Sequence, residues 1–211
     1  MARLDERGWR TFVSDPALAA AVQSLAVAAD GTAWLGTAEG LVSLTGLAAD
    51  GCRFDEIQPG ISGVAALTDS EGTVWFGTLA HGALRQGVGA QPGDVRWDNV
   101  AVPLLTLAPD GALWFASPQL EWLTRRGSGG ATRIPLRQDV VTAQAVTALA
   151  VAPDLTVWLG TARGVVSLVG GEWRRWETAV GLADNEITHL LVQPDGSVWL
   201  ATRGGVSRYR P

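Results

Sequence analysis

One tryptophan-centred segment recurs five times along the chain, and this repeat limits the possible folds more than any other feature. Successive tryptophans are separated by 41, 39, 44 and 41 residues. A period of about 42 residues is typical of a four-stranded propeller blade, whereas helical repeats of similar length need apolar residues spaced 3.6 apart, which these segments lack. The recurring side chains, which we expect to pack between neighbouring blades, are Trp34, Trp75, Trp114, Trp158 and Trp199.

Each repeat predicts two strands joined by a tight turn. In the first repeat, the apolar run from Val22 to Val27 is followed by Asp30-Gly31 and then by Ala33-Trp34-Leu35. Asp-Gly between two apolar runs predicts a type I′ hairpin turn, which needs positive φ at both central residues. In the second repeat Ser70-Glu71-Gly72 predicts one extra residue, as a bulge or a longer turn, and in the fourth repeat Leu155 in place of glycine predicts a different turn geometry.

The last repeat ends at Pro211 without an outer strand, but Gly8-Trp9-Arg10-Thr11-Phe12 near the beginning resembles the outer segment Gly171 to Trp176. We therefore predict an all-β fold, a five-bladed β-propeller of four-stranded antiparallel blades in a single domain, closed by the N-terminal strand completing the last blade. An open arc, or a larger ring completed by another chain, is the alternative. The predicted blades comprise about residues 22–57, 61–100, 102–136, 146–177 and 187–211 plus 8–13.

Charge and cysteine content exclude several classes of protein. The net charge is −5 at neutral pH, so a general nucleic-acid-binding surface, which is normally basic, is not expected. A single cysteine, Cys52, excludes an internal disulfide and a cysteine-cluster metal site. No apolar stretch approaches the roughly 20 residues of a membrane-spanning helix. We expect a monomer that does not insert into membranes and holds no cofactor or metal.

The repeats resemble a known family. The segment from Asn185 to Tyr209 resembles the two-component regulator propeller repeat, in which an apolar strand is followed by Asp-Gly, an apolar strand with a tryptophan, and Gly-Thr. Val22 to Leu44 and Val146 to Leu168 match about as well, whereas the third repeat has Ala116-Ser117-Pro118 in place of Gly-Thr. In that family such propellers commonly form the extracytoplasmic sensing part of hybrid histidine kinases.

A second resemblance is looser. The segment from Ala108 to Phe115 also resembles repeats of the virginiamycin B lyase propellers, enzymes that use a histidine base and Mg²⁺ on a seven-bladed ring. The family resemblance leaves the compartment open. As it stands the sequence predicts a soluble, cytoplasmic protein, and an extracytoplasmic one if the chain is part of a longer sensor protein.

Candidate binding residues lie in the turns after the tryptophan strands and at the starts of the first strands. In a propeller these positions gather on one face, the usual ligand site of the architecture. His189 stands where the other repeats have Ser24, Gly63, Leu104 and Ala148, so the scaffold does not require an imidazole there. We assign the hairpin aspartates, such as Asp30, to turn geometry rather than to metal binding. The predicted site residues are Glu39, His81, Gln119, Arg163, Arg203, Asn185, Glu186 and His189.

The predicted function is a non-catalytic ligand-binding or protein-interaction module, of the sensor type. Its expected partner is a small polar molecule, a carbohydrate or a peptide bound at one face of the central channel. The alternative is a lyase or hydrolase in which His189 and Glu186 act with a divalent metal ion. Carboxylates converging with His189 would favour the enzyme, whereas scattered polar groups would favour the binding module.

Overall fold

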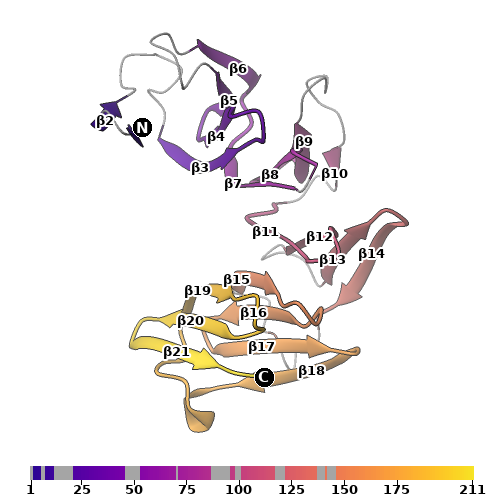
Figure 1. The fold of residues 1–211 in the computed structure, drawn as a ribbon. Coiled ribbons are helices and arrows are strands. Elements are labelled where there is room, and N and C mark those ends of the chain that lie inside the picture. Colours follow the sequence, from indigo (N-terminus) through magenta and orange to yellow (C-terminus); the bar gives the residue numbers. More distant parts are fainter. Residues whose placement is uncertain are drawn as a thin grey trace. The chain divides into compact units, whose positions relative to one another are not determined.

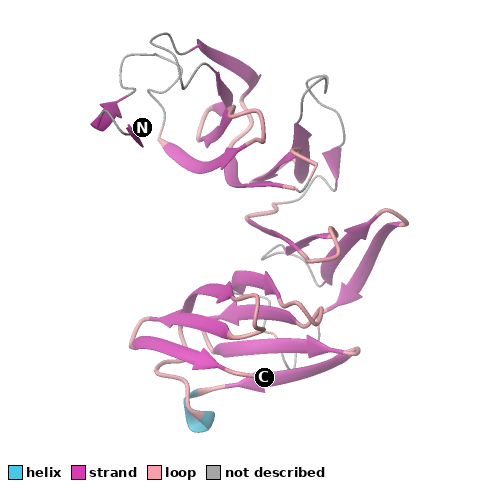
Figure 2. Ribbon diagram, in the orientation of Figure 1, coloured by secondary structure: helices cyan, strands magenta, loops and turns pink. Residues whose placement is uncertain are grey.

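The computed structural model describes residues 2–5, 8–11, 21–45, 53–69, 71–86, 96–97, 101–116, 122–136, 141 and 146–211. Nearly all regular structure in these residues is β-strand (Figures 1 and 2), and a single-turn 3₁₀ helix, η2, covers Thr178–Val180. The chain forms two compact units, Met1–Trp97 and Asp98–Pro211.

The strands form five consecutive antiparallel sheets that follow the sequence repeats, which we name blades 1 to 5, and one separate hairpin of β1 and β2. Blades 1 to 4 have four strands each in the order of the chain, and blade 5 has three among the described residues. The all-β prediction and the blade-like sheets are therefore confirmed. The strands of the hairpin and of the first unit are β1 (Ala2–Asp5), β2 (Gly8–Thr11), β3 (Val22–Val27), β4 (Ala33–Thr37), β5 (Gly40–Thr45), β6 (Arg53–Pro59), β7 (Gly63–Thr68), β8 (Val74–Thr78), β9 (Ala83–Gln86) and β10 (Arg96–Trp97).

The second unit contains blades 3 to 5. In Figure 1 the orange and yellow strands of blades 4 and 5 lie against each other, with the first strand of each blade beside that of the next. The strands of this unit are β11 (Leu104–Leu107), β12 (Leu113–Ala116), β13 (Trp122–Gly127), β14 (Gly130–Pro135), β15 (Val146–Val151), β16 (Val157–Thr161), β17 (Gly164–Val169), β18 (Glu172–Trp176), β19 (Ile187–Val192), β20 (Val198–Thr202) and β21 (Gly205–Tyr209).

The hairpin turns between first and second strands correct the type I′ prediction. In blade 1 the Gly31 N–H donates to the Ala28 carbonyl and the Ala28 N–H donates to the Thr32 carbonyl, each at 2.9 Å. Gly31 has φ +82°, whereas Asp30 is not among the residues with positive φ. This is a three-residue loop with one left-handed residue, a type I turn followed by a G1 bulge. The aspartate serves the turn as predicted, because its Oδ1 accepts the Thr32 N–H at 2.9 Å.

The predicted bulge in the turn of blade 2 is confirmed but is not particular to that blade, and the different turn geometry predicted for blade 4 is wrong. In blade 2 the Gly72 N–H donates to Asp69 and the Asp69 N–H donates to Thr73, so this turn has the same length as that of blade 1. The extra residues of the second repeat precede its first strand. Gly63, and not Ile61, pairs with Thr78. In the same way Val22 pairs with Thr37 in blade 1 and Ile187 pairs with Thr202 in blade 5. In blade 4 the turn is also unchanged, and Leu155 itself takes the left-handed conformation, with φ +67°.

Replacing Leu155 by glycine is expected to stabilise the protein. A left-handed conformation costs an L-residue other than glycine roughly 1–2 kcal/mol, and the Leu155 side chain is 49% exposed, so little packing is lost. We expect the free energy of unfolding to rise by about 1 kcal/mol in urea denaturation, after the larger chain entropy of glycine is subtracted. The reverse change at the equivalent residue, Gly111→Ala, should lower it by a similar amount. Equal stability of Leu155→Gly and the parent protein would contradict the turn geometry.

The cores lie between neighbouring blades, as the recurring tryptophans predict. Trp114 is 6% exposed and packs with Leu159 and Leu168 of blade 4, and Trp158 is 4% exposed and packs with Ile187 and Leu200 of blade 5. In the first unit, the half-buried Trp34 packs against a cluster that includes Phe76 of blade 2. Trp34, Trp114 and Trp158 therefore each cover a face of the following blade, and burial of such a ring typically contributes about 3–5 kcal/mol.

The closed ring would join the N-terminal hairpin to blade 5. The predicted outer segment Gly8 to Phe12 forms strand β2 over Gly8–Thr11, and the described partner of β2 is β1. β21 is paired with β20 on one side, and no described strand pairs with its other side.

Candidate functional site

The same side-chain-closed turn follows the tryptophan strand in four blades. In blade 1 the Thr37 hydroxyl donates to the Gly40 carbonyl at 2.9 Å and accepts the backbone N–H groups of Glu39 and Gly40 at 3.2 and 3.0 Å. Such a hydroxyl satisfies the backbone of a turn locally, whatever residue stands at the tip. The other threonines whose hydroxyls donate to the glycine carbonyl are Thr78, Thr161 and Thr202, at 2.7 to 2.8 Å.

The residues at the tips of these turns vary as the sequence suggested. Glu39 and Arg163 are exposed, and His81 is half-buried. Arg203 lies one position earlier in its turn than Arg163, because Gly204 occupies the position equivalent to Arg163. The fifth predicted tip residue, Gln119, lies outside the described residues. Glu39 and His81 belong to the first unit and the remaining predicted residues to the second.

Blade 5 brings two of the predicted residues into direct contact. Glu186 Oε1 lies 2.8 Å from Arg203 Nε, and the two side chains are 44% and 73% exposed. The backbone reinforces this pair, because the Arg203 N–H donates to the Glu186 carbonyl at 3.1 Å. An exposed ion pair contributes at most about 1 kcal/mol to stability, so its main consequence is a fixed orientation of two opposite charges at the surface.

Asn185 connects this pair to the turn of blade 4. Its carbonyl accepts the Gly164 N–H at 2.6 Å, and its side-chain Oδ1 accepts the Thr178 N–H at 2.8 Å. The turn that carries Arg163 is thereby attached to the start of blade 5. We call Arg163, Asn185, Glu186 and Arg203 the polar cluster, and Asn185 has a structural role in it that the sequence did not indicate.

His189 does not join this ion pair. It is exposed, and it follows a β-bulge between Ile187 and His189 in the first strand of blade 5. Within the described part of the chain, no hydrogen bond or ion pair links His189 to Glu186 or to Arg203. The register makes Ala65, and not Gly63, its equivalent in blade 2. Among the described residues no group of three or more His, Cys, Asp or Glu side chains is placed to hold a metal ion.

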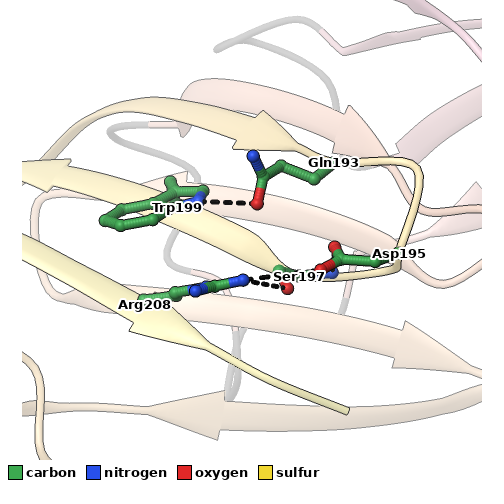
Figure 3. A network of polar contacts seen from close by, with 5 residues as sticks. All are labelled: Gln193, Asp195, Ser197, Trp199 and Arg208. Carbon is green, nitrogen blue, oxygen red and sulfur yellow. Dashed lines mark hydrogen bonds and ion pairs between the residues drawn. The ribbon is translucent and has the colours of Figure 1, made fainter.

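A polar network that was not predicted from the sequence lies on the tryptophan face of blade 5 (Figure 3). The Trp199 indole N–H donates to Gln193 Oε1 at 3.0 Å, and Arg208 Nη2 lies 2.9 Å from Ser197 Oγ and 3.4 Å from Asp195 Oδ2. The guanidinium lies over the Trp199 ring, 5.1 Å from its centroid. The backbone N–H of Ser197, followed by its hydroxyl and by Arg208, lowers the pKa of Asp195. A polar residue at position 193, where three other repeats have alanine, was the available signal.

A cleft of about 430 Å³ lies between blades 4 and 5. Its floor includes three aromatic rings, with centroids 6.4 Å apart for Trp158 and Trp176, 5.0 Å for Trp158 and Tyr209, and 5.5 Å for Trp176 and Tyr209. The hairpins of both blades complete the walls, with Asp154 and Asp195 among the lining residues. No sequence motif marks this cleft, because it is a property of how two blades meet.

Antiparallel sheets that follow one another along the chain, with apolar cores between blades 1 and 2, between blades 3 and 4 and between blades 4 and 5, are the arrangement of β-propeller blades. Residues 181–204 match the family described as two component regulator propeller, which confirms the resemblance expected from the repeats. No curated protein matches the sequence. None of the described residues forms a helix long and apolar enough to cross a membrane.

Solved structures share this fold. The extracellular domain of BT3049, from a hybrid two component system of B. thetaiotaomicron, superposes with a TM-score of 0.71 and 19% identity, over 90% of this chain and 27% of that one. The extracellular domain of BT4673 from the same organism gives 0.70 and 16%, over 95% and 28%. Virginiamycin B lyase from Staphylococcus aureus gives 0.64 and 14%, over 100% and 76%. The chain thus spans little more than a quarter of the two extracellular domains, and at these identities the likeness is one of fold.

Proposed function

We propose that the chain is a non-catalytic, sensor-type propeller module that binds a polar ligand or a peptide. The binding face comprises the polar cluster together with His189 and the turn-tip residues Glu39, His81 and Gln119. The observation that carries this proposal is the threonine-closed turn of blades 1, 2, 4 and 5, which has a different side chain at its tip in each of these blades. A frame that is held by the backbone and one hydroxyl leaves the tip residues available for recognition.

The likeness to extracellular domains of bacterial signalling proteins supports a sensor role. Those domains are much longer than this chain, so the role is carried over as a proposal. In the polar cluster the charges of Glu186 and Arg203 are already oriented towards each other. A ligand with hydrogen-bonding groups of both kinds can therefore bind without first ordering these side chains.

A thermal-shift panel of neutral sugars, sugar acids, amino acids and short peptides tests the proposal. A ligand present at 100 times its dissociation constant stabilises the folded state by about 2.7 kcal/mol, which corresponds to a rise of about 5–10 °C in Tm for a domain of this size. We expect the shift to be lost in the double variant Glu186→Ala/Arg203→Ala. The control removes another exposed ion pair, Glu172 with Arg174 on the outer strand of blade 4, whose closest atoms are 3.8 Å apart. A ligand-induced rise in Tm that persists in the Glu186→Ala/Arg203→Ala variant and disappears in the control variant would contradict the site.

We also propose that the ring closes within one chain, with Gly8–Thr11 as the outer strand of blade 5. Support comes from apolar side chains left open on both terminal blades. Val22, Leu25 and Val27 of β3 are 42%, 51% and 55% exposed, and on blade 5 Val206 is 64% exposed. Its equivalent in blade 4, Val165, is 1% exposed. Two such faces, one on the first blade and one on the last, are what a closed ring would bury.

A further inference from the structure

In three blades an arginine stands directly opposite the repeated tryptophan on the neighbouring strand of the sheet. Residues opposite each other in antiparallel strands lie on the same face, so each guanidinium can cover the ring beside it. Blade 4 departs from this pattern, because the residue opposite Trp158 is Ser167. Blade 1 also has a serine at this position, Ser43 opposite Trp34. The three pairs with arginine are Trp75 with Arg85, Trp114 with Arg125, and Trp199 with Arg208.

These arginines contact both the tryptophan and the strand or hairpin beside it. In blade 5 the Arg208 guanidinium lies over the ring, and its Nη2 donates to Ser197 Oγ at 2.9 Å and to Asp195 Oδ2 at 3.4 Å (Figure 3). In blade 3 Arg125 Nη2 donates to Asp110 Oδ2 at 2.7 Å. In blade 2 the guanidinium lies 5.9 Å from the centroid of its tryptophan ring. A cation held by an aromatic ring and a polar hairpin is thus a recurring contact of the repeat.

Blade 4 keeps the groups that receive such an arginine. Asp154 and Thr156 are the equivalents of Asp195 and Ser197, because each aspartate Oδ1 accepts the N–H two residues further on, at 2.9 Å. In the described part of the chain, neither Asp154 Oδ2 nor the Thr156 hydroxyl has a hydrogen-bond or ion-pair partner. The two groups that hold the guanidinium in blade 5 are therefore available to another donor in blade 4.

The cleft between blades 4 and 5 lies at this position. Asp154, Thr156 and Ser167 are among its lining residues, together with the three aromatic rings of its floor. Two of these rings, Trp176 and Tyr209, are only half-buried. The volume of about 430 Å³ is within the range of pockets that bind small ligands. The cleft therefore combines room for a ligand group with the surroundings of the missing arginine.

The charges around the cleft favour a cation, although its lining includes one arginine. That residue, Arg174, has its own carboxylate partner, because its Nη2 lies 3.8 Å from Glu172 Oε2. The second lining carboxylate, Asp195, is paired with Arg208. Asp154 is thus the lining carboxylate that has no cationic partner among the described residues. A carboxylate beside exposed aromatic surface attracts a cation through both its charge and the ring faces.

We infer that the cleft between blades 4 and 5 binds an alkylguanidinium group, such as the arginine side chain of a peptide. The bound group takes the place that Arg208 has in blade 5, over the aromatic floor, and donates to Asp154 Oδ2 and the Thr156 hydroxyl. A guanidinium suits this site better than an ammonium, because its plane stacks on rings while its N–H groups donate within that plane. The cleft is at the hairpin end of β16 and the polar cluster at the other end, so this is a second site beyond the proposed function.

Isothermal titration calorimetry of the full chain with N-acetyl-arginine amide tests the site. We expect Asp154→Asn to weaken binding at least about tenfold, because asparagine can still accept the Thr156 N–H but carries no charge. The neutral analogue N-acetyl-citrulline amide should bind the parent at least about tenfold more weakly for the same reason. The matched control is Asp30→Asn, the same change in the hairpin of blade 1, which should leave the affinity unchanged.

Two further variants change the occupancy and the charge of the cleft. Ser167→Arg restores the arginine of the other blades and should abolish binding, because its side chain fills the site. Arg174→Gln should strengthen binding, because it removes a like charge from the lining. If Ser167→Arg does not fold, Asp154→Asn on its exposed hairpin still decides the question.

The outcomes distinguish this site from the polar cluster and identify the source of the guanidinium. No binding of N-acetyl-arginine amide to the parent, or equal affinity of the parent and Asp154→Asn, would overturn the inference. Loss of binding in Glu186→Ala/Arg203→Ala would also overturn it, because that variant leaves the cleft intact. Butylguanidinium is the second probe. Its tighter binding would support a free small molecule in the site, and tighter binding of N-acetyl-arginine amide would support a peptide side chain there.

Discussion

Replacing Val206 by aspartate should lower the free energy of unfolding by about 3–5 kcal/mol, the largest loss that we expect from any single exposed position. Val206 is 64% exposed on blade 5, whereas the equivalent Leu41 of blade 1 and Val165 of blade 4 are 0% and 1% exposed beneath their neighbouring blades. In the proposed closed ring, the β3 face of blade 1 covers Val206. An unpaired carboxylate would then be buried in an apolar interface, which is strongly destabilising. Urea denaturation measures the change.

Val180 provides the matched control for this substitution. It lies on η2 and is 62% exposed, so Val180→Asp should change stability by no more than about 0.5 kcal/mol. If Val206→Asp behaves like the control, the face of blade 5 is open to water and the ring does not close over it. Light scattering adds a second readout. A parent protein that is oligomeric, and that becomes monomeric on this substitution, would show that the exposed faces meet between copies rather than within one chain.

The strands were predictable because each repeat combines two local signals. Alternating apolar residues mark a strand, and Gly31 or its equivalent marks the turn that follows it. The turn type was not predictable from the same residues. Both a type I′ turn and a type I turn with a G1 bulge favour glycine after aspartate, and only the hydrogen bond from Ala28 to Thr32 decides between them. Leu155 is left-handed for the same reason, because the Ala152 N–H donates to the Thr156 carbonyl and the turn then requires a left-handed third residue even where it is not glycine.

The candidate site was predictable in composition but not in detail. The pairing of Glu186 with Arg203 follows from two strands joined by one hairpin. His189 was expected beside this pair, but the bulge at Thr188 changes the register of the strand and the ion pair forms without it. Arg203 was grouped with Arg163, but the two turns have the same length and Gly204 occupies the position of Arg163, so Arg203 lies one residue earlier. Bulges and one-residue shifts of this kind change which side chains meet without changing the apolar pattern.

The cleft between blades 4 and 5 could not be predicted from any segment alone. Its walls come from residues as far apart as Ala152 and Pro211, and its volume depends on the absence of a described outer strand in blade 5. The sequence does contain one indirect signal. Trp173 recurs as Trp9 at the other end of the chain, which suggests that the position it fills in blade 4 has a counterpart elsewhere.

Gly36→Ala is expected to cost about 3 kcal/mol or more, because blades 1 and 2 approach each other backbone to backbone at this residue. A Cβ at Gly36 would overlap the Gly63 carbonyl oxygen of β7 and the Ser24 hydroxyl. It would also displace the hydrogen bond in which Ser24 Oγ donates to the Gly63 carbonyl at 2.9 Å. Overpacking typically costs 1–3 kcal/mol, and here the obstacle is a backbone carbonyl that cannot rotate away.

The control for this change is Gly129→Ala in the hairpin turn of blade 3, where an added Cβ meets nothing within 4 Å. That substitution reduces the entropy of the unfolded chain without a clash, so it should raise the free energy of unfolding by up to about 1 kcal/mol. The two alanine substitutions are therefore expected to act in opposite directions in the same urea titration. A cost below about 1 kcal/mol for Gly36→Ala would mean that blades 1 and 2 separate readily. The glycine of the Gly-Thr motif would then serve local strand geometry and not the close packing of successive blades.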